Sequence, residues 1–264
     1  MIHYAMGSNM SNFNFLDLPD ELQEHVFRFL DLKTLLNCRQ TCKKICETLS
    51  SDRVWRNILC RKIGLKNLAL CGVTANVHLK WQWSFLLAKH GLLGKNLLKS
   101  AELLSSWNVL SSGGDGWTVE CPPHGADPLP EEAGVSSCFA TSFHSCSKQQ
   151  VIDLWKCGFA PGFLDELQPK IIYGEWYAGR FDCGCVYELK LELINKDHKR
   201  IMIEECRETI QQWEGSAWNK IHKELKDYGP GLRYIKFFNG GMDLLYWKGH
   251  YGAKMAGPFL IITL

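Results

Sequence analysis

A strict two-residue alternation in the C-terminal half is the feature that most limits how this chain can fold. From Tyr187 to Leu193 the sequence reads Tyr-Glu-Leu-Lys-Leu-Glu-Leu. Because successive side chains of a strand point to opposite faces, this pattern predicts a β-strand with one apolar and one charged face. Such a strand needs a second layer to cover its apolar face, so we expect a layered β structure around it.

Further strands are predicted at Arg200–Glu204, Arg233–Phe238 and Phe259–Leu264, where apolar and β-branched residues cluster. Turn residues bound them at Tyr228–Gly231 and Asn239–Gly241, because glycine permits positive φ and proline removes a ladder donor. The C-terminal two-thirds of the chain is therefore predicted to be an antiparallel, jelly-roll-like β-sandwich.

The N-terminal third has helical periodicity instead. Apolar residues recur every three or four positions from about Pro19 to Leu30, and a proline suits the first turn of a helix. A second helical segment should extend to about Ser50, and a third should contain Val54–Leu59. Three short helices in about fifty residues enclose little core, so we expect this unit to complete its burial against a partner or the next domain.

The chain is thus predicted to be an α+β protein with four segments. These are a disordered tail at 1–12, a three-helix unit at 13–60, a helical linker at 61–95 and the β-sandwich at 96–264.

Charge and composition exclude several classes of protein. Lys and Arg number 30 against 28 Asp and Glu, so a net charge of +2 gives no field that would hold nucleic acid or an anionic membrane. No apolar run approaches the roughly 18 residues of a membrane helix, and the first residues do not resemble a signal peptide. We therefore expect a cytoplasmic protein, in which the 12 cysteines are free thiols.

The sequence favours neither a metal site nor a catalytic site. The best metal candidate is the set Cys121, His124, Cys138, His144 and Cys146, whose spacing is not paired as in zinc sites. The carboxylates that suggest a glycosidase are Asp165, Glu166, Asp182 and Asp243, and that reaction needs two of them roughly 5 to 10 Å apart. We expect no metal, no cofactor and no catalytic residue.

A loop at Tyr246–Gly252 is the best candidate for a binding surface. It places three aromatic residues and a lysine between glycines, which is too polar and too prone to turns for a buried strand. An indole face binds the C–H face of a sugar ring, so Trp247 is the candidate platform and Lys248 a candidate donor. The alternative is that Trp247 only closes the end of the sandwich. Trp213 and Trp218 are predicted to pack in the structure.

The helical unit resembles the F-box, the motif by which substrate receptors join Skp-cullin ubiquitin ligases. The resemblance rests on the sequence Phe-Leu-Asp-Leu-Pro-Asp-Glu-Leu at Phe15–Leu22 and on the later Val54-Trp55. It implies that a Skp-type adaptor and, through it, the cullin scaffold are partners of this chain. The residues expected to carry adaptor binding, some of which must also hold the helices together, are Leu18, Pro19, Leu22, Leu35, Leu36 and Trp55.

The remainder is similar to the F-box-associated domain of the sugar-recognising F-box proteins. The matching stretches include Cys138–Phe143, Glu175–Arg180, Asp227–Arg233 and Tyr246–Lys254. The resemblance implies a ten-stranded antiparallel sandwich, and some members of the family bind the inner chitobiose of high-mannose N-glycans. It implies a glycan site made of Phe139, Glu175, Trp176, Tyr246, Trp247 and Lys248, in which Glu175 replaces the Asp of the sugar binders.

These observations predict a non-catalytic substrate adaptor of a ubiquitin ligase that binds N-glycans on misfolded glycoproteins and directs them to ER-associated degradation. The protein would then act in the cytoplasm, including the cytosolic face of the ER. One alternative is the same adaptor with a protein ligand that carries no sugar. Another is a carbohydrate-active enzyme.

Overall fold

The structure is a computed structural model that describes residues 14–30, 32–63, 93–99, 102–159 and 161–263. The chain divides into two compact units, Met1–His90 and Gly91–Leu264, which are described separately. Among the described residues, no helix has the length and apolar character needed to cross a membrane.

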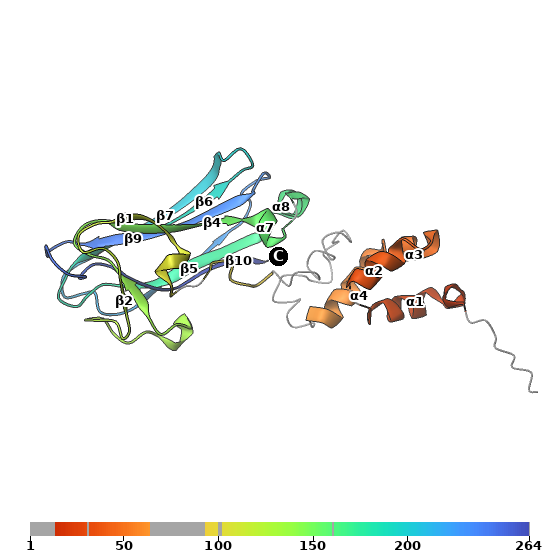
Figure 1. Cartoon of the computed structure of the whole chain (residues 1–264), viewed down its shortest axis with the longest axis horizontal. Coiled ribbons are helices and arrows are strands. Elements are labelled where there is room, and N and C mark those ends of the chain that lie inside the picture. Colours follow the sequence, from red (N-terminus) through yellow and green to blue (C-terminus); the bar gives the residue numbers. More distant parts are fainter. Residues whose placement is uncertain (1–13, 31, 64–92, 100–101, 160, 264) are drawn as a thin grey trace, which may run out of the picture. The chain divides into compact units, whose positions relative to one another are not determined.

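The N-terminal unit is helical (Figure 1). Its elements are η1 (Phe15–Asp17), α1 (Asp20–Phe27), α2 (Leu32–Arg39), α3 (Lys43–Thr48) and α4 (Asp52–Ile63). The prediction of one helix up to Ser50 is wrong, because Cys42 has an extended backbone that separates α2 from α3. The side chains that fill this unit's core are Phe27, Leu35, Leu49, Val54, Trp55 and Ile58.

The C-terminal unit consists of two antiparallel sheets that lie face to face, as predicted (Figure 1). The strands are β1 (Asn108–Ser112), β2 (Thr118–Glu120), β3 (Cys138–Ala140), β4 (Cys146–Asp153), β5 (Lys170–Ala178), β6 (Cys185–Ile194), β7 (Arg200–Ile210), β8 (Asn219–Leu225), β9 (Tyr234–Asp243) and β10 (Lys254–Thr263). The sheet order is β2-β3-β10-β5-β8 in the first sheet, sheet A, and β1-β4-β9-β6-β7 in the second, sheet B. Short helices are η2 (Leu104–Ser106), η3 (Glu131–Ala133), α7 (Leu154–Cys157) and α8 (Pro161–Leu167).

The alternating stretch forms strand β6 of sheet B, and its apolar side chains face sheet A. Tyr187, Leu189, Leu191 and Leu193 are at most 1% exposed, whereas the charged residues between them are partly exposed. The pattern therefore predicted both the strand and its buried face.

Strand β9 is longer than predicted, and the expected turn at Asn239–Gly241 is wrong. These residues continue the strand between β4 and β6. A Cβ on Gly240 would lie 2.6 Å from the carbonyl oxygen of Cys146, and one on Gly241 would lie 2.5 Å from that of Val186. The two glycines are thus needed for close strand approach rather than for a turn.

The predicted helical linker lies largely outside the described residues, as does the tail at 1–12. The described segment 93–99 runs beside strand β10, where Asn96 forms a bridge with Ile261 and the Leu97 amide donates to the Leu260 carbonyl at 2.8 Å. This segment is therefore attached to the sandwich and is not helical.

A buried polar network connects the two sheets. Glu175 of β5 accepts hydrogen bonds from the Tyr187 hydroxyl at 2.6 Å and the Asn239 amide at 2.7 Å, and Lys148 Nζ donates to Asn239 Oδ1 at 2.7 Å. All four side chains are fully buried. Burial raises the pKa of the Glu175 carboxyl and lowers the pKa of the Lys148 ammonium to about 7.

Aromatic rings enclose the same ammonium group. Lys148 Nζ lies 4.4 to 4.5 Å from the ring centroids of Trp107, Trp117 and Phe139. Cation–π contacts of this kind offset part of the cost of burying a charge. The network therefore links strands β4, β5, β6 and β9 with the residues around β2 and β3.

We predict that Lys148→Met lowers the free energy of unfolding by roughly 3 to 5 kcal/mol, because it leaves Glu175 buried without its cation. The double variant Lys148→Met with Glu175→Gln should recover part of that loss, since it removes both charges. Urea unfolding of the full chain measures both values. If the double variant loses as much free energy of unfolding as the two single variants lose together, the two residues are not coupled.

We also predict unequal reactivity among the cysteines, which are free thiols in the described residues. Burial raises the pKa of Cys138 and Cys185 to about 12 and that of Cys183 to about 11, whereas Cys121 is exposed. Alkylation of the native protein, followed by mass spectrometry, should label Cys121 first, and denaturation should make every cysteine reactive. Equal labelling rates of Cys121 and Cys138 in the native protein would refute this.

Candidate functional site at the end of the sandwich

The loop between β9 and β10, residues 244–253, is called the tip loop and lies at one end of the sandwich (Figure 1, left). Asp243 anchors its first turn, because its Oδ1 atom accepts hydrogen bonds from the amides of Leu245 at 3.1 Å and Tyr246 at 2.9 Å. The side chain is buried, and burial raises its pKa. Asp243 is therefore a turn residue that bonds the backbone that follows it.

Two neighbouring loops hold the middle of the tip loop. The Gly249 amide donates to Asp115 Oδ2 at 2.6 Å, and the Ser142 hydroxyl donates to the Gly249 carbonyl at 2.6 Å. Gly249 has φ of +83°, and a Cβ there would lie 2.7 Å from the Tyr251 ring. Only glycine fits this position without strain, so the shape of the loop is encoded locally.

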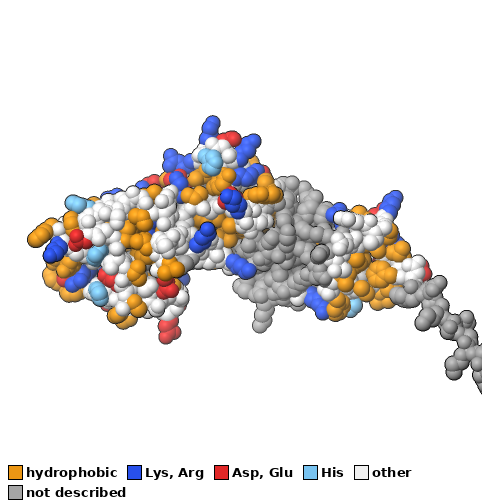
Figure 2. All heavy atoms as spheres, in the orientation of Figure 1, with side chains coloured by type: hydrophobic (Ala, Val, Ile, Leu, Met, Phe, Trp, Pro, Cys, Tyr) orange, Lys and Arg blue, Asp and Glu red, His pale blue; other side chains and the backbone are white. Residues whose placement is uncertain are grey.

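The tip loop encloses a hollow of about 350 Å³, called the tip pocket, lined by Tyr246, Trp247, Lys248, Gly249 and Tyr251. Trp247 is 80% exposed, and the Tyr246 and Tyr251 rings lie 4.6 Å apart. The alternative that Trp247 closes the end of the sandwich is therefore wrong. Figure 2 shows hydrophobic side chains together with Lys and Arg at this end.

The tip pocket has the chemistry expected of a site for a polar ring compound. An exposed indole face attracts C–H groups, while an ammonium and two phenol hydroxyls exchange hydrogen bonds with ligand hydroxyls. The loop is fixed by Asp243, Asp115 and Ser142, so its groups need little reorganisation to bind.

Two residues predicted for this site lie elsewhere. Phe139 is 2% exposed and contacts Trp117 and Lys148 in the core, and Glu175 is fully buried in the network between the sheets. Direct contact with a ligand would require either side chain to leave the core. We therefore correct the prediction by removing both from the set of direct contacts.

Trp176 is also separate from the tip pocket. It follows Glu175 on β5, so its side chain points to the opposite, outer face of sheet A, where Lys220 Nζ lies 5.2 Å from its ring. Tyr246, Trp247 and Lys248 are thus the predicted glycan residues that the structure brings together.

The structure places two further residues in the loops around the tip. Asp182 accepts a hydrogen bond from Arg180 at 2.6 Å, and its carbonyl oxygen lies 3.5 Å from the Tyr246 hydroxyl. Phe143 is partly exposed and follows Ser142, which bonds the tip loop. Their position in the sequence indicates such a place, because Asp182 and Phe143 lie in short turns after strands, whereas Phe139 and Glu175 lie within strands.

The packing role predicted for Trp213 is wrong. Its side chain is 70% exposed and lies beside Phe181, with ring centroids 6.2 Å apart. Trp218 agrees better with the prediction, because it is partly buried and its indole N–H donates to the Asp127 carbonyl at 2.8 Å.

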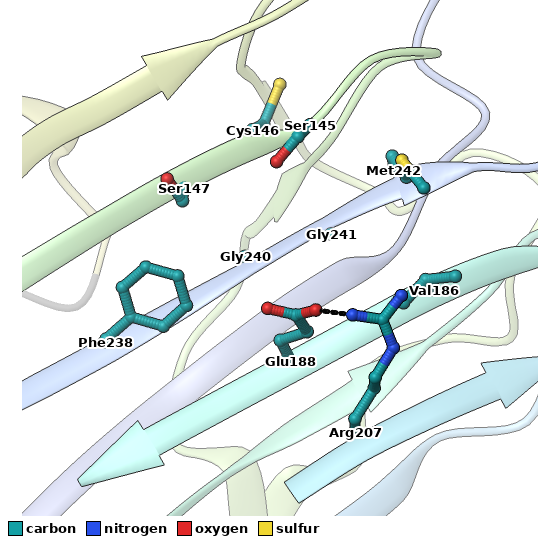
Figure 3. Close-up of a pocket in the computed structure, with 10 residues that line it drawn as sticks. All are labelled: Ser145, Cys146, Ser147, Val186, Glu188, Arg207, Phe238, Gly240, Gly241 and Met242. Atoms are coloured by element: carbon teal, nitrogen blue, oxygen red, sulfur yellow. Dashed lines mark hydrogen bonds and ion pairs between the residues drawn. The ribbon is translucent and has the colours of Figure 1, made fainter. Parts of the chain in front are cut away.

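A second, smaller hollow of about 180 Å³ lies on the outer face of sheet B, above Gly240 (Figure 3). Glu188 and Arg207 come from adjacent strands and point toward each other as an ion pair. Their charges are already matched, and none of the predicted glycan-binding residues lines this hollow. The tip pocket is therefore the stronger candidate.

The titratable residues weighed for catalysis or metal binding do not gather at one point. Asp165 binds Arg233, which precedes β9, whereas Asp243 ends the same strand. Within the part of the chain that the structure describes, no group of three or more His, Cys, Asp or Glu residues could hold a metal ion.

The helical unit exposes an apolar surface on α1 and on the turn that follows it. Leu22, Val26 and Phe29 are 51%, 40% and 58% exposed. Gln23 is buried and its amide donates to the carbonyls of Leu16 and Leu18, which fixes the turn that precedes the helix.

The predicted adaptor-binding residues divide between surface and core. Leu22 and Pro19 are exposed and Leu18 is partly exposed, but Leu35 and Trp55 are only 1% exposed. Trp55 donates its indole N–H to the Leu49 carbonyl at 2.7 Å, so we correct its role, and that of Leu35, to holding the helices together. The side chain of Leu36 lies outside the described residues.

The helical unit has an exposed apolar face and the sandwich has an aromatic pocket at its end, so the chain has two candidate binding surfaces. Family models match both parts: an F-box-like motif at residues 15–61 and an F-box associated region at residues 89–262. The chain belongs to the family of F-box proteins that carry this associated region.

Relatives are similar over nearly the whole chain. F-box only protein 6 of Mus musculus is 32% identical over 94% of this chain and 83% of its own length. F-box only protein 2 of Bos taurus is 34% identical over 90% of this chain and 80% of its own, and F-box only protein 44 of Homo sapiens is 29% identical over 94% and 96%. Among solved structures, a carbohydrate-binding module in complex with β-1,4-galactotriose aligns over 64% of this chain and 99% of its own, with 14% identity and a TM-score of 0.41.

Proposed function

We propose that this protein is a non-catalytic substrate adaptor of a Skp-cullin-type ubiquitin ligase and that its sandwich binds N-glycans. The observation that carries the glycan part is the 80% exposure of Trp247 beside Lys248 on an anchored loop. The F-box-like motif and the exposed apolar side chains of α1 support the ligase part.

The α1 surface has the properties of a docking site for an adaptor. Leu22 and Val26 lie four residues apart on one side of α1, and the exposed Phe29 follows in the turn after the helix. Burying three such side chains against a partner releases apolar surface from water, which is the main driving force of association. In the proposal, this surface binds a Skp-type adaptor, which in turn binds the cullin scaffold.

The tip pocket suits the chitobiose core of an N-glycan. Each N-acetylglucosamine ring has a C–H face for stacking on Trp247 and hydroxyl and acetamido groups for hydrogen bonds with Lys248, Tyr246 and Tyr251. The two sugars next to the asparagine lie nearest to the carrier polypeptide, so loss of its folded structure would make them more accessible. In the proposal, the clients are therefore misfolded glycoproteins that reach the cytoplasm, including the cytosolic face of the ER, for degradation.

We predict that Leu22→Ala with Phe29→Ala lowers affinity for the Skp-type adaptor roughly 100-fold, because each truncation removes about 1 to 1.5 kcal/mol of apolar burial. The two side chains lie outside the core of the helical unit, so folding should be retained. Co-purification and titration with the adaptor measure the loss. Leu103→Ala, which truncates a 60% exposed leucine of the sandwich unit, is the matched control. If the double variant still binds the adaptor as tightly as the parent does, the adaptor does not bind at this surface.

We predict that Trp247→Ala weakens binding of free chitobiose by roughly 2 to 4 kcal/mol, because it removes the stacking platform. Lys248→Ala should cost only about 1 kcal/mol, because an exposed ammonium exchanges a sugar hydroxyl for water. Isothermal titration of folded variants checks both, with Trp155→Ala as a control, since this 64% exposed Trp lies on α7, beyond the other end of β4. A Trp247→Ala protein that binds as well as the parent would exclude the tip pocket.

A further inference from the structure

Next to the tip pocket lies an exposed apolar surface that the sugar site does not use. It is formed by Phe181, Trp213, Leu244 and Leu245, called the apolar patch, which are 47%, 70%, 44% and 51% exposed. These side chains come from three separate loops, at 179–184, 211–218 and the start of the tip loop. The Phe181 and Trp213 rings lie side by side, with centroids 6.2 Å apart, and exposed apolar side chains that adjoin in this way are typical of an interaction site.

Hydrogen bonds between the loops keep this surface together. The Trp213 amide donates to the Phe181 carbonyl at 2.9 Å, and the Leu244 amide donates to the Gly184 carbonyl at 2.9 Å. The Asp182 carbonyl accepts a hydrogen bond from the side-chain amide of Gln212 at 3.1 Å and lies 3.5 Å from the Tyr246 hydroxyl of the tip pocket. The apolar patch and the tip pocket therefore share one framework and are contiguous.

The backbone holds Trp213 outward at an energetic cost. Its φ is +73°, a conformation that bulky residues adopt rarely and with a penalty of roughly 1 kcal/mol or more. The side chain remains 70% exposed, so it gains little burial in return. Backbone strain that packing does not offset is typical of ligand-binding sites.

We infer that the apolar patch binds an uncharged, apolar polypeptide segment that flanks the glycosylated asparagine of the ligand in the tip pocket. This inference rests on the proposed glycan binding, since an N-linked sugar necessarily brings its carrier polypeptide to the edge of the pocket. The nearest charged groups on the loop at 179–184, Arg180 and Asp182, pair with each other at 2.6 Å. That loop therefore selects apolar side chains rather than an ionic motif.

A second copy of this chain fits the apolar patch less well. Because the patch is contiguous with the tip pocket through Leu245 and Tyr246, a dimer built on it would cover Trp247 and block the sugar. A flexible polypeptide leaves the pocket open and carries the sugar into it. The ligand that satisfies both surfaces is thus a single glycosylated chain with apolar neighbours around its asparagine.

The test compares three probes by fluorescence anisotropy and calorimetry: free chitobiose, a peptide with chitobiose on asparagine and Leu and Phe on both sides, and the same glycopeptide with Ser and Gly instead. We expect the apolar glycopeptide to bind about tenfold more tightly than the polar one. The variant Phe181→Ser with Trp213→Asn should abolish this difference while leaving affinity for free chitobiose unchanged. Asn tolerates positive φ, so the backbone between these loops is retained.

Trp155→Ser, which removes an equally exposed Trp away from the tip, is the matched control and should keep the tenfold difference. Equal affinity of the parent for both glycopeptides, or a difference that survives in the double variant, overturns the inference. A third outcome also overturns the inference: the parent protein self-associates, the double variant does not, and the residues beside the asparagine of the glycopeptide have no effect. That outcome would assign the patch to a second copy of the chain.

Failure of the apolar patch can be distinguished from failure of the proposed glycan binding. If the parent binds no chitobiose, the apolar peptide without sugar, titrated to millimolar concentration, replaces the glycopeptide. Binding that is lost in Phe181→Ser with Trp213→Asn then supports the apolar patch as a polypeptide site, and absence of binding overturns it.

Discussion

The hydrogen-bonded chain from Lys148 through Asn239 to Glu175 and Tyr187 is the interaction on which the sandwich depends. Two charged groups buried away from water need hydrogen-bond partners within the protein. Here the Asn239 amide bonds both Lys148 and Glu175, and aromatic rings enclose the Lys148 ammonium. Apolar contacts between sheets are non-directional. A buried network of directional bonds fixes one arrangement of the two sheets, because any shift leaves a charge without its partner.

That fixed arrangement determines the shape of the tip. The tip loop begins at residue 244, only five residues after Asn239 of β9. The loop that contains Ser142 bonds the tip loop and connects β3 to β4, the strands that carry Phe139 and Lys148. Trp247 is thus held outward by a loop whose two ends are set by the core. A rigid scaffold below variable loops is a common way to position a binding surface, since the loops then lose little entropy when a ligand binds.

Two surfaces of different chemistry follow from the two units. The helical unit exposes Leu22, Val26 and Phe29, which suit a permanent apolar interface, while the sandwich exposes aromatic side chains next to Lys248, which suit a polar ring ligand. An adaptor needs both kinds of surface on one chain. Beside the tip pocket, Trp213 adds further exposed apolar surface to the sandwich.

The sequence by itself determined the class of fold, since the alternation around Leu191 predicts a two-layer β structure and the spacing in the N-terminal third predicts helices. It also determined the tip loop, because aromatic residues between glycines are incompatible with a buried strand. Only the tertiary structure decided that Glu175 and Phe139 lie in the core and Trp213 at the surface. Periodicity fixes which neighbours share a face of a strand, but the packing of the sheets decides which face is buried, and a buried Glu is stable only with partners as distant in sequence as Asn239.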